Sequence, residues 1–289
     1  MNYAPTLYLK CNVIFDMIIL VLILMLFISP FAFAEDQVSQ QTVDEFNLVQ
    51  YDDGGQKKWK LNGKSAEVEG KKVKIDEISA LTFGEEAIFK LKAKTGSFDR
   101  EKGIMYLEDN VVIKTTGGTT LRTDSLNWVT GTKNAFTDRY VNIRKGDLDV
   151  SGIGAEFDFR AKTAELKKDI VANITSLDPS YLTTSNKEQV TTIICDGPLE
   201  LDYKKNRAIF FNNVEVKDKE SNVFADRISV YFNPNTRRIK YVVARGSVRI
   251  VNGGNVTYSE KAIYLVDKGR VVLPKRTKLV IQSNEKLIQ

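Results

Sequence analysis

The sequence predicts an all-β protein, built as an elongated stack of antiparallel hairpins behind an N-terminal apolar helix. Two observations lead to this fold class. Apolar and polar residues alternate with a period of two from Trp59 onward, and a short phrase recurs six times, about thirty residues apart. No stretch of the sequence after Trp59 keeps the i, i+3, i+4 stripe of an amphipathic helix. Repetition on this scale indicates like units that bury their apolar faces only by stacking.

Residues 1–34 form the first element, an export segment. Residues 17–27 are all apolar, and a helix-breaking proline followed by Ala32 and Ala34 resembles a signal-peptidase site. The fully apolar core is shorter than the roughly 20 residues that a spanning helix needs, but residues 17–34 together are just long enough. The segment is therefore either a signal peptide cleaved after Ala34 or a retained membrane anchor. Both alternatives place the rest of the chain outside the cytoplasm.

The remaining chain divides by composition. Residues 35–58 are polar and are expected to be a flexible linker. A β-domain is expected over residues 59–176 and a second one over residues 193–289. Between them, proline, serine, asparagine and charged residues cluster, so residues 177–192 are expected to be a seam or linker.

Each repeat consists of two predicted strands joined by a charged turn. Small or hydroxylated residues occupy the middle of the first strand, and a bulky residue stands near the turn. Small mid-strand residues let two facing layers bend toward each other or leave room between them. The well-marked turns are at residues 99–103, 131–134, 204–206, 233–235 and 267–269, and a weaker one is at residues 160–163.

The second strand of each repeat ends in an apolar-x-apolar pair. In a stack these pairs form two apolar columns on one face, with rungs about 4.8 Å apart. If the layers close on each other, the columns are an ordinary core. If the layers stay parted, they line a trough in which each buried CH₂ of a fatty chain contributes about 0.8 kcal/mol. The pairs are Val111/Ile113, Val141/Ile143, Ala172/Ile174, Val214/Val216, Val248/Ile250 and Leu279/Ile281.

Composition argues against several classes of function. The net charge of +5 is mild. The sequence lacks the basic stripe with interleaved aromatics that would predict a nucleic-acid partner. Histidine is absent, which removes the commonest general base and metal ligand, so neither a metal site nor a cofactor is expected. Cys11 and Cys195 lie too far apart to suggest a disulfide framework or thiolate site, and Cys195 is expected to be a small apolar residue in a strand.

Several stretches resemble a known export pathway. Residues 59–70 (WKLNGKSAEVEG) and 96–128 (GSFDREKGIMYLEDNVVIKTTGGTTLRTDSLNW) resemble LptC-type proteins, which are periplasmic components of lipopolysaccharide export. Residues 195–216 (CDGPLELDYKKNRAIFFNNVEV) and 225–251 (ADRISVYFNPNTRRIKYVVARGSVRIV) resemble LptA/OstA-type proteins of the same pathway. Together the two resemblances cover nearly all of the chain after the expected linker.

The resemblance, over about 59–174 for LptC and 190–283 for LptA/OstA, implies a twisted β-jellyroll in the form of a V-shaped sandwich. It implies a non-enzymatic lipopolysaccharide carrier and bridge, whose interior holds lipid A acyl chains while the sugar-phosphate head stays in water. The implied location is the periplasm, with residues 13–34 as a tether to the inner membrane if they are retained. The expected lipid-binding residues are Val111, Ile113, Trp128, Val141, Ile143, Phe159, Ile174, Phe210, Val214, Val216, Phe232, Val248 and Ile250.

The implied partners, besides lipopolysaccharide, are the inner-membrane lipopolysaccharide ABC transporter and further bridge subunits or an outer-membrane assembly protein. The latter would join by edge-strand pairing. Leu279, Val280 and Ile281 are expected to form such a partner edge strand. Lys275 and Arg276 precede them, however, and charged residues also protect edges from pairing, so both interpretations stay open.

Two other functions compete with lipid transport. One is an envelope β-scaffold with a sealed core that binds protein partners by edge-strand pairing and carries no lipid. The other is a glycan hydrolase that uses paired carboxylates, for which Asp109, Asp124, Asp138 and Asp226 are the candidates. Acidic residues at turns and on solvated faces are the ordinary explanation of these four. The sequence offers no nucleophile–base constellation and no glycine-rich phosphate loop before a helix.

Overall fold

A computed structural model describes residues 41–51, 54–83, 89–129, 132, 134–158, 161–176, 189–219, 221–236, 238–274 and 277–281. These residues form one antiparallel sheet of 17 strands and one short 3₁₀ helix, η1 (Val266–Lys268), so the all-β prediction is confirmed. The expected N-terminal helix lies outside the described residues. Within the described part of the chain, no helix is both long enough and apolar enough to cross a membrane.

The strands follow one another along the whole chain. In the first half they are β1 (Gln41–Tyr51), β2 (Lys57–Glu69), β3 (Lys72–Thr82), β4 (Phe89–Asp99), β5 (Ile104–Thr115), β6 (Thr119–Val129), β7 (Asn134–Lys145), β8 (Leu148–Asp158) and β9 (Thr163–Ser176). In the second half they are β10 (Gln189–Cys195), β11 (Leu199–Asp202), β12 (Arg207–Lys217), β13 (Ser221–Phe232), β14 (Ile239–Asn252), β15 (Asn255–Leu265), β16 (Arg270–Val272) and β17 (Thr277–Val280).

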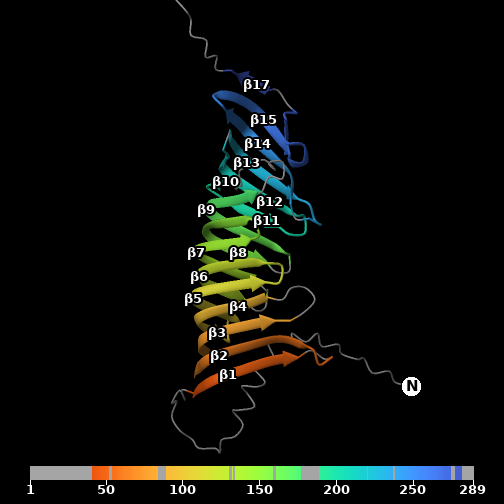
Figure 1. Ribbon diagram of the computed structural model, residues 1–289. Helices are drawn as coiled ribbons and strands as arrows, with labels where there is room; N and C mark the ends of the chain where they lie inside the picture. Colours follow the sequence, from red (N-terminus) through yellow and green to blue (C-terminus); the bar gives the residue numbers. More distant parts are fainter. Residues whose placement is uncertain are drawn as a thin grey trace, which may run out of the picture.

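Apart from β10 with β11 and β16 with β17, each strand pairs with its neighbour in sequence, so the sheet is a meander stacked rung on rung. Figure 1 shows the result as a long column with β1 at one end and β17 at the other. At two levels of the column, two short strands lie end to end in the place of one long strand. β10 and β11 both lie between β9 and β12, and β16 and β17 both pair with β15.

Most strands turn a corner near their middle, where the pairing register shifts. In β5, Leu107 and Val111 are buried while Glu108, Asp109 and Asn110 between them are exposed. In a straight strand Leu107, Asp109 and Val111 would face the same side, because successive side chains alternate. Asp109 and Asn110 instead have left-handed φ angles of 60° and 56°, which redirect the chain.

The same corner recurs up the column. Left-handed residues occupy it at Asp169 in β9, at Asn212 and Asn213 in β12, and at Gly246 and Ser247 in β14. Asn, Asp and Gly adopt this conformation at the lowest cost, which explains their presence in the middle of strands. Because the corners stack, the sheet folds along one line into two layers, and inward side chains from both layers form a single hydrophobic core.

Small residues occupy the inside of the corner on the alternate strands. A Cβ added to Gly96 of β4 would lie 2.5 Å from Cδ1 of Ile78, and one added to Gly152 of β8 would lie 2.7 Å from Cδ1 of Ile170. These distances are shorter than any real carbon contact, so only glycine lets the side chain of the next rung fill the corner.

Four of the turns at one end of the strands are closed by an Asp or Asn side chain. Asp99 Oδ1 accepts hydrogen bonds from the backbone N–H groups of Glu101 and Lys102, both at 3.0 Å. Asp158, Asp202 and Asn233 do the same in the β8–β9, β11–β12 and β13–β14 turns. These N–H groups stabilise the charged form of the acids and thereby lower the pKa of Asp99 and of Asp202.

The structure corrects the expectation that residues 35–58 are a linker. Residues 41–51 of that segment form β1, which pairs with β2 over its length. Phe46 and Leu48 pack against the core from it. The apolar signal is present in the sequence but is broken at Glu45, whose left-handed φ of 50° makes a corner and interrupts the alternation.

The structure also corrects the end of the expected seam at residues 177–192. Its last residues begin β10 at Gln189, and β10 pairs with β9 from Gln189↔Ser176 to Cys195↔Ile170. The two halves of the chain are therefore joined by continuous backbone pairing as well as by the covalent connection. The residues between Ser176 and Gln189 lie outside the described part.

Candidate functional site

The interior between the two layers is the principal apolar site of the described residues. Beside the corner it is tightly packed: Val111, Val141, Val214 and Val248, each just after a corner, are at most 1% exposed. Leu107 and Leu126 close the other side of the corner in the same way. At this line the two layers contact each other directly.

Burial falls from the corner toward the strand ends. Val111 is fully buried, but Ile113, the next inward residue of β5, is 8% exposed. On β12 and β14 the step is larger, because Val216 and Ile250 are only partly buried while Val214 and Val248 are sealed. The layers are therefore closed along the corner and become more accessible toward the turns.

The other layer shows the same gradient. Leu126 of β6 is fully buried and Trp128, nearer the turn, is half-buried. Ile228 of β13 is sealed and Phe232 at the end of the strand is only partly buried. On β6 and β13, too, the exposure of the inward side chains rises from the corner toward the strand end, whereas Ala135, next to the β6–β7 turn, is fully buried.

The residues expected to bind lipid fall into two sets by this criterion. Those sealed at the corner are Val111, Val141, Phe210, Val214 and Val248. Those farther out are Ile113 and Ile143, at 8% and 6% exposed, and the partly buried Trp128, Ile174, Val216, Phe232 and Ile250. Phe159 lies outside the described residues. All twelve described members belong to the core or pack against it.

Sequence reasoning overlooked the inward residues on the near side of each corner. Leu107, Leu126, Leu166, Leu199 and Ile228 are among the most buried side chains, and Leu199 and Ile228 lie beside the expected Phe210 on the neighbouring strands. Their signal was the alternation itself. The alternation identifies these residues only when the place of the corner is known, because the period-two pattern of inward residues is offset there.

The expected partner edge is exposed. Leu279, Val280 and Ile281 are 57%, 44% and 68% exposed. β17 pairs with β15 on one side, from Thr277↔Ser259 to Val280↔Val256, and within the described residues its other side has no strand. At the opposite end of the column, β1 pairs only with β2 among the described strands.

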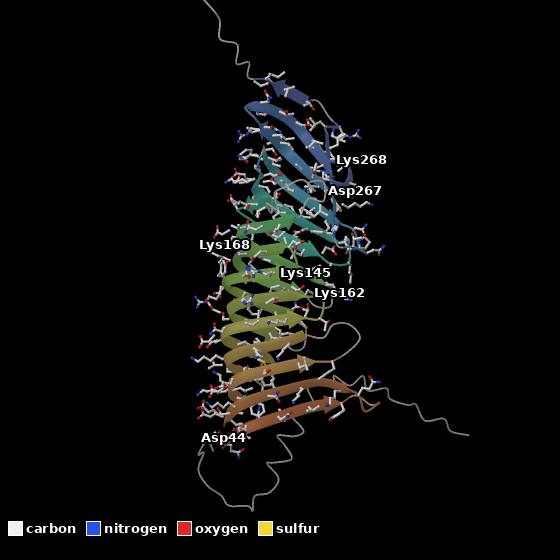
Figure 2. The ribbon with its side chains drawn as sticks, in the orientation of Figure 1. Asp44, Lys145, Lys162, Lys168, Asp267 and Lys268 are labelled. Atoms are coloured by element: carbon white, nitrogen blue, oxygen red, sulfur yellow. The ribbon has the colours of Figure 1, made fainter. Side chains whose placement is uncertain are left out.

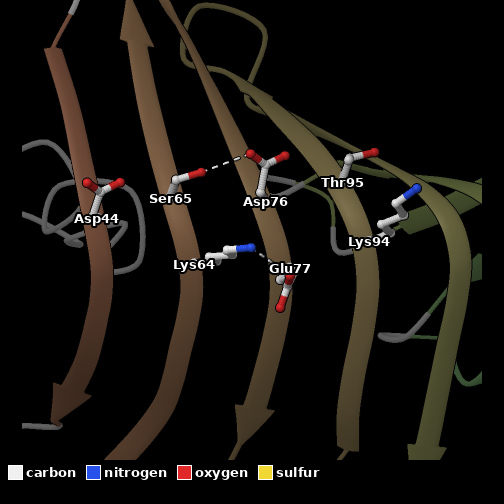
Figure 3. A pocket seen from close by; sticks show the side chains of 7 residues that line it. All are labelled: Asp44, Lys64, Ser65, Asp76, Glu77, Lys94 and Thr95. Atoms are coloured by element: carbon white, nitrogen blue, oxygen red, sulfur yellow. Dashed lines mark hydrogen bonds and ion pairs between the residues drawn. The ribbon is translucent and has the colours of Figure 1, made fainter.

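A polar hollow of about 330 Å³ lies outside the corner of β1 to β4. Figure 3 shows its lining side chains side by side on the four strands. Ser65 Oγ donates to Asp76 Oδ2 at 2.8 Å, and Lys64 Nζ lies 3.4 Å from Glu77 Oε1. Because these groups are exposed and largely satisfy one another, the hollow resembles an ordinary solvated surface rather than a reaction site.

The candidate carboxylates for hydrolysis lie on the exposed outside of the corners. Asp109, Asp124, Asp138 and Asp226 come from four different strands, and all four are exposed. Asp138 lies 3.7 Å from Arg139, and Asp226 accepts a hydrogen bond from Ser247 at 3.4 Å. Among the described residues, no three His, Cys, Asp or Glu side chains gather into a potential metal site.

Cys195 is buried in β10, and burial raises the pKa of its thiol to about 11. The thiol is therefore neutral near pH 7 and packs as a small apolar group, since only the thiolate is a good nucleophile or metal ligand.

Comparison with known proteins identifies both halves. Residues 17–175 match the model of the lipopolysaccharide-assembly, LptC-related family, and residues 197–288 match that of the LptA/(LptD N-terminal domain) LPS transport proteins. A solved structure that the chain resembles is LptH from Pseudomonas aeruginosa, the LptA-homologous periplasmic component of the lipopolysaccharide transport device. The identity is 14%, with 68% of this chain and 95% of that chain covered, at a TM-score of 0.19. A comparison with curated proteins found no match.

The fold and the two matches define a β-jellyroll protein of lipopolysaccharide transport. The LptC-related model covers more than half of the 289 residues. The chain belongs to the lipopolysaccharide-assembly, LptC-related family, and it carries an LptA-type transport domain in tandem on the same polypeptide.

Proposed function

We propose that this protein is a non-enzymatic periplasmic carrier that holds the lipid A acyl chains of lipopolysaccharide between its two layers. The observation that supports the proposal most is the burial gradient. A pair of layers hinged at a sealed corner and parting toward the strand ends can admit hydrocarbon without breaking a backbone hydrogen bond. The sealed residues are the hinge, and the outer set, such as Ile143, Ile174, Val216 and Ile250, contacts the acyl chains.

The energetics suit a carrier. A dozen acyl carbons removed from water contribute about 10 kcal/mol before the costs of binding are subtracted. The apolar contacts need no specific hydrogen bond, and the same inward pairs recur on successive rungs. A lipid can therefore exchange one rung for the next at nearly constant free energy, so net movement along the column requires only that energy be supplied at one end. We assign that energy supply to the inner-membrane lipopolysaccharide ABC transporter.

The tandem arrangement extends the proposal to a bridge. LptC-type and LptA-type halves share one continuous sheet through the β9–β10 pairing, so the apolar interior of one half leads into that of the other. β17 is the end we propose to meet a further bridge subunit or an outer-membrane assembly protein by strand pairing. In this proposal residues 1–34 deliver the chain to the periplasm and either leave it there or tether it to the inner membrane.

Site-specific photocrosslinking in cells tests the carrier function. A photoreactive residue at Ile143, on the inward face of β7, is expected to crosslink to lipopolysaccharide. The matched control is Tyr140 on the same strand, which is 56% exposed on the outside. Crosslinking to lipid from Tyr140 and not from Ile143 would contradict the proposal.

A second candidate function is an envelope scaffold that carries no lipid. The exposed apolar side chains of Leu279 and Ile281 on the terminal rung favour it, because they suit strand pairing whatever the interior holds. Mass spectrometry of the purified protein separates the two candidates. A co-purifying glycolipid supports the carrier, whereas its absence from protein that still binds its partners supports the scaffold.

A further inference from the structure

The turns at one end of the strands lie one above the other and form a rim along the column. Turns at this end follow β2, β4, β6, β8, β11, β13 and β15, and backbone hydrogen bonds join three neighbouring pairs of them. Arg100 N donates to the carbonyl of Lys71 at 3.0 Å, Tyr203 N donates to that of Lys162 at 3.1 Å, and Phe232 N donates to that of Asn206 at 2.9 Å. Successive turns are two rungs apart, about 10 Å.

Exposed cations occupy this rim in the upper part of the column. We call the set of Lys162, Lys204, Arg238, Lys268 and Arg270 the cationic lip; all five are exposed. In Figure 2, Lys162 and Lys268 lie on the side of the column opposite to Asp44 and Lys168, which mark the corner. No member of the lip forms an ion pair with any described residue.

The acidic residues of the same turns are largely engaged elsewhere. Asp158 accepts the N–H of Ala161 at 2.7 Å, and Asp202 accepts the N–H of Lys205 at 2.9 Å and pairs with its ammonium at 3.0 Å. Asp267 is the exposed exception. The side chains that close the turns thus leave the neighbouring cations uncompensated, and repulsion among like charges at this spacing favours an external anion.

The opposite rim is different in chemistry. Its turns at residues 116–118 and 252–255 consist of Thr, Gly and Asn and carry no charge. The turn at residues 145–147 balances Lys145 with Asp147. The β12–β13 turn at residues 218–220 holds Lys219 between Asp218 and Glu220, so the turns of this rim carry no excess of positive charge.

Apolar residues lie immediately inside the cationic lip. Leu201 is the next-to-last residue of β11, Phe232 is the last residue of β13, and Ile239 begins β14 after the β13–β14 turn. All three are partly buried against the core. From the interior to the rim, the protein thus presents a sealed corner, then partly exposed apolar strand ends and then cations without an ion pair. An anionic lipid has the same order, with apolar tails followed by a charged head.

We propose that the cationic lip binds the phosphate groups of lipid A as the lipid passes along the column. This inference rests on the proposed carrier function and adds a polar track to it. Acyl chains enter between the layers, and the phosphates remain in water beside the lysine and arginine side chains. With one turn every 10 Å or so, the head can contact the next cations before it leaves the last.

The test compares two probes and two variants of the purified full-length chain. The probes are lipid A with both phosphates and the same lipid with both removed. The lip variant combines Lys162→Asn, Lys204→Gln, Arg238→Gln and Lys268→Gln, in which asparagine suits the left-handed φ of 59° at position 162. The control variant neutralises as many cations at the corner, with Lys64→Gln, Lys94→Gln, Arg139→Gln and Lys168→Gln.

The wild type and the control variant are expected to bind the phosphorylated lipid at least about tenfold more tightly than the dephosphorylated one, because each engaged cation contributes about fivefold. The lip variant is expected to lose this preference and keep its affinity for the dephosphorylated lipid. An unchanged preference in the lip variant, or an equal loss in the control variant, would overturn the cationic lip alone. If the wild type binds neither lipid, the carrier function fails and the lip falls with it.

Discussion

Gly152 of β8 and Ile170 of β9 lie against each other inside the corner, and a Cβ on Gly152 would stand 2.7 Å from Cδ1 of Ile170. Ile170 is fully buried, so it has little room to retreat. We therefore expect Gly152→Ala to lower the free energy of unfolding by about 1–3 kcal/mol through overpacking. Urea unfolding followed by circular dichroism measures the change.

A compensating substitution isolates the cause. Ile170→Val removes Cδ1 and alone is expected to cost about 0.5–1.5 kcal/mol. The double variant should be more stable than the sum of the two single changes predicts. The rescue is expected to be partial, because the added Cβ still meets the carbonyl oxygen of Lys168 at 3.1 Å. Strict additivity would show that the contact is not responsible.

The left-handed corner of β5 gives a second prediction. Asn110 has a φ of 56°, a conformation that asparagine tolerates and a β-branched residue does not. Asn110→Val is therefore expected to destabilise the protein by about 1–2 kcal/mol, whereas Asn110→Gly should be nearly neutral. Thermal unfolding of the two variants checks this, and equal melting temperatures would contradict a left-handed requirement at the corner.

These corners mark the limit of what the sequence could predict. Alternation and turn chemistry identify the β-class, the repeats and the charged turns, because those depend on neighbours in sequence. Asp109 and Asn110 look like turn residues, yet they lie inside one strand, since pairing with β4 and β6 resumes beyond them. Whether such a pair ends a strand or bends it is decided by the rungs above and below it.

The same dependence explains the division of the interior. The inward pair Val248 and Ile250 is identical in pattern to any core pair, and nothing in the pattern says that one is sealed and the other partly exposed. That difference comes from distance to the corner, a feature of the folded sheet. The missed strand β1 has a similar origin, because its alternation breaks at Glu45, where the corner lies.

Acid sensitivity is expected to originate partly in the turns. The N–H groups of Lys102 and Lys205 are the largest cause that lowers the pKa of Asp99 and Asp202 below the ordinary value of 3.8. A lowered pKa in the folded state contributes stability that is fully present above about pH 5 and is lost as the pH falls through the lowered pKa.

Replacing both acids with asparagine tests this. Asn233 already closes the equivalent β13–β14 turn, so Asp99→Asn with Asp202→Asn should keep the turn hydrogen bonds. The double variant is expected to be less stable than the wild type at pH 7 and to lose less stability between pH 7 and pH 3. Denaturation midpoints of both proteins at pH 7 and pH 3 measure these losses. An equal loss of stability in the wild type and the double variant would exclude the two carboxylates as a source of acid sensitivity.

The burial gradient separates folding from lipid binding. Val248→Asp places a charge at a sealed position without a partner, and we expect a loss of several kcal/mol and little folded protein. Ile250→Asp, two residues farther from the corner and partly exposed, is expected to fold and to lose lipid crosslinking. Tyr258→Asp, on an exposed side chain of the next strand, is the control for both. Normal lipid crosslinking in folded Ile250→Asp would argue against acyl chains near this rung.

The terminal rung makes the last prediction. Leu279 and Ile281 are exposed, so Leu279→Lys with Ile281→Lys should leave the melting temperature nearly unchanged, since surface substitutions usually shift stability by no more than about 0.5 kcal/mol. The same change adds charge to an edge proposed to accept another strand, which is how natural edges avoid pairing. Crosslinking in cells between β17 and the next component of the bridge should therefore fall strongly. Phe136→Lys, at an exposed position of β7 in the middle of the column, is the matched control. An equal fall in both variants would mean that β17 is not the contact.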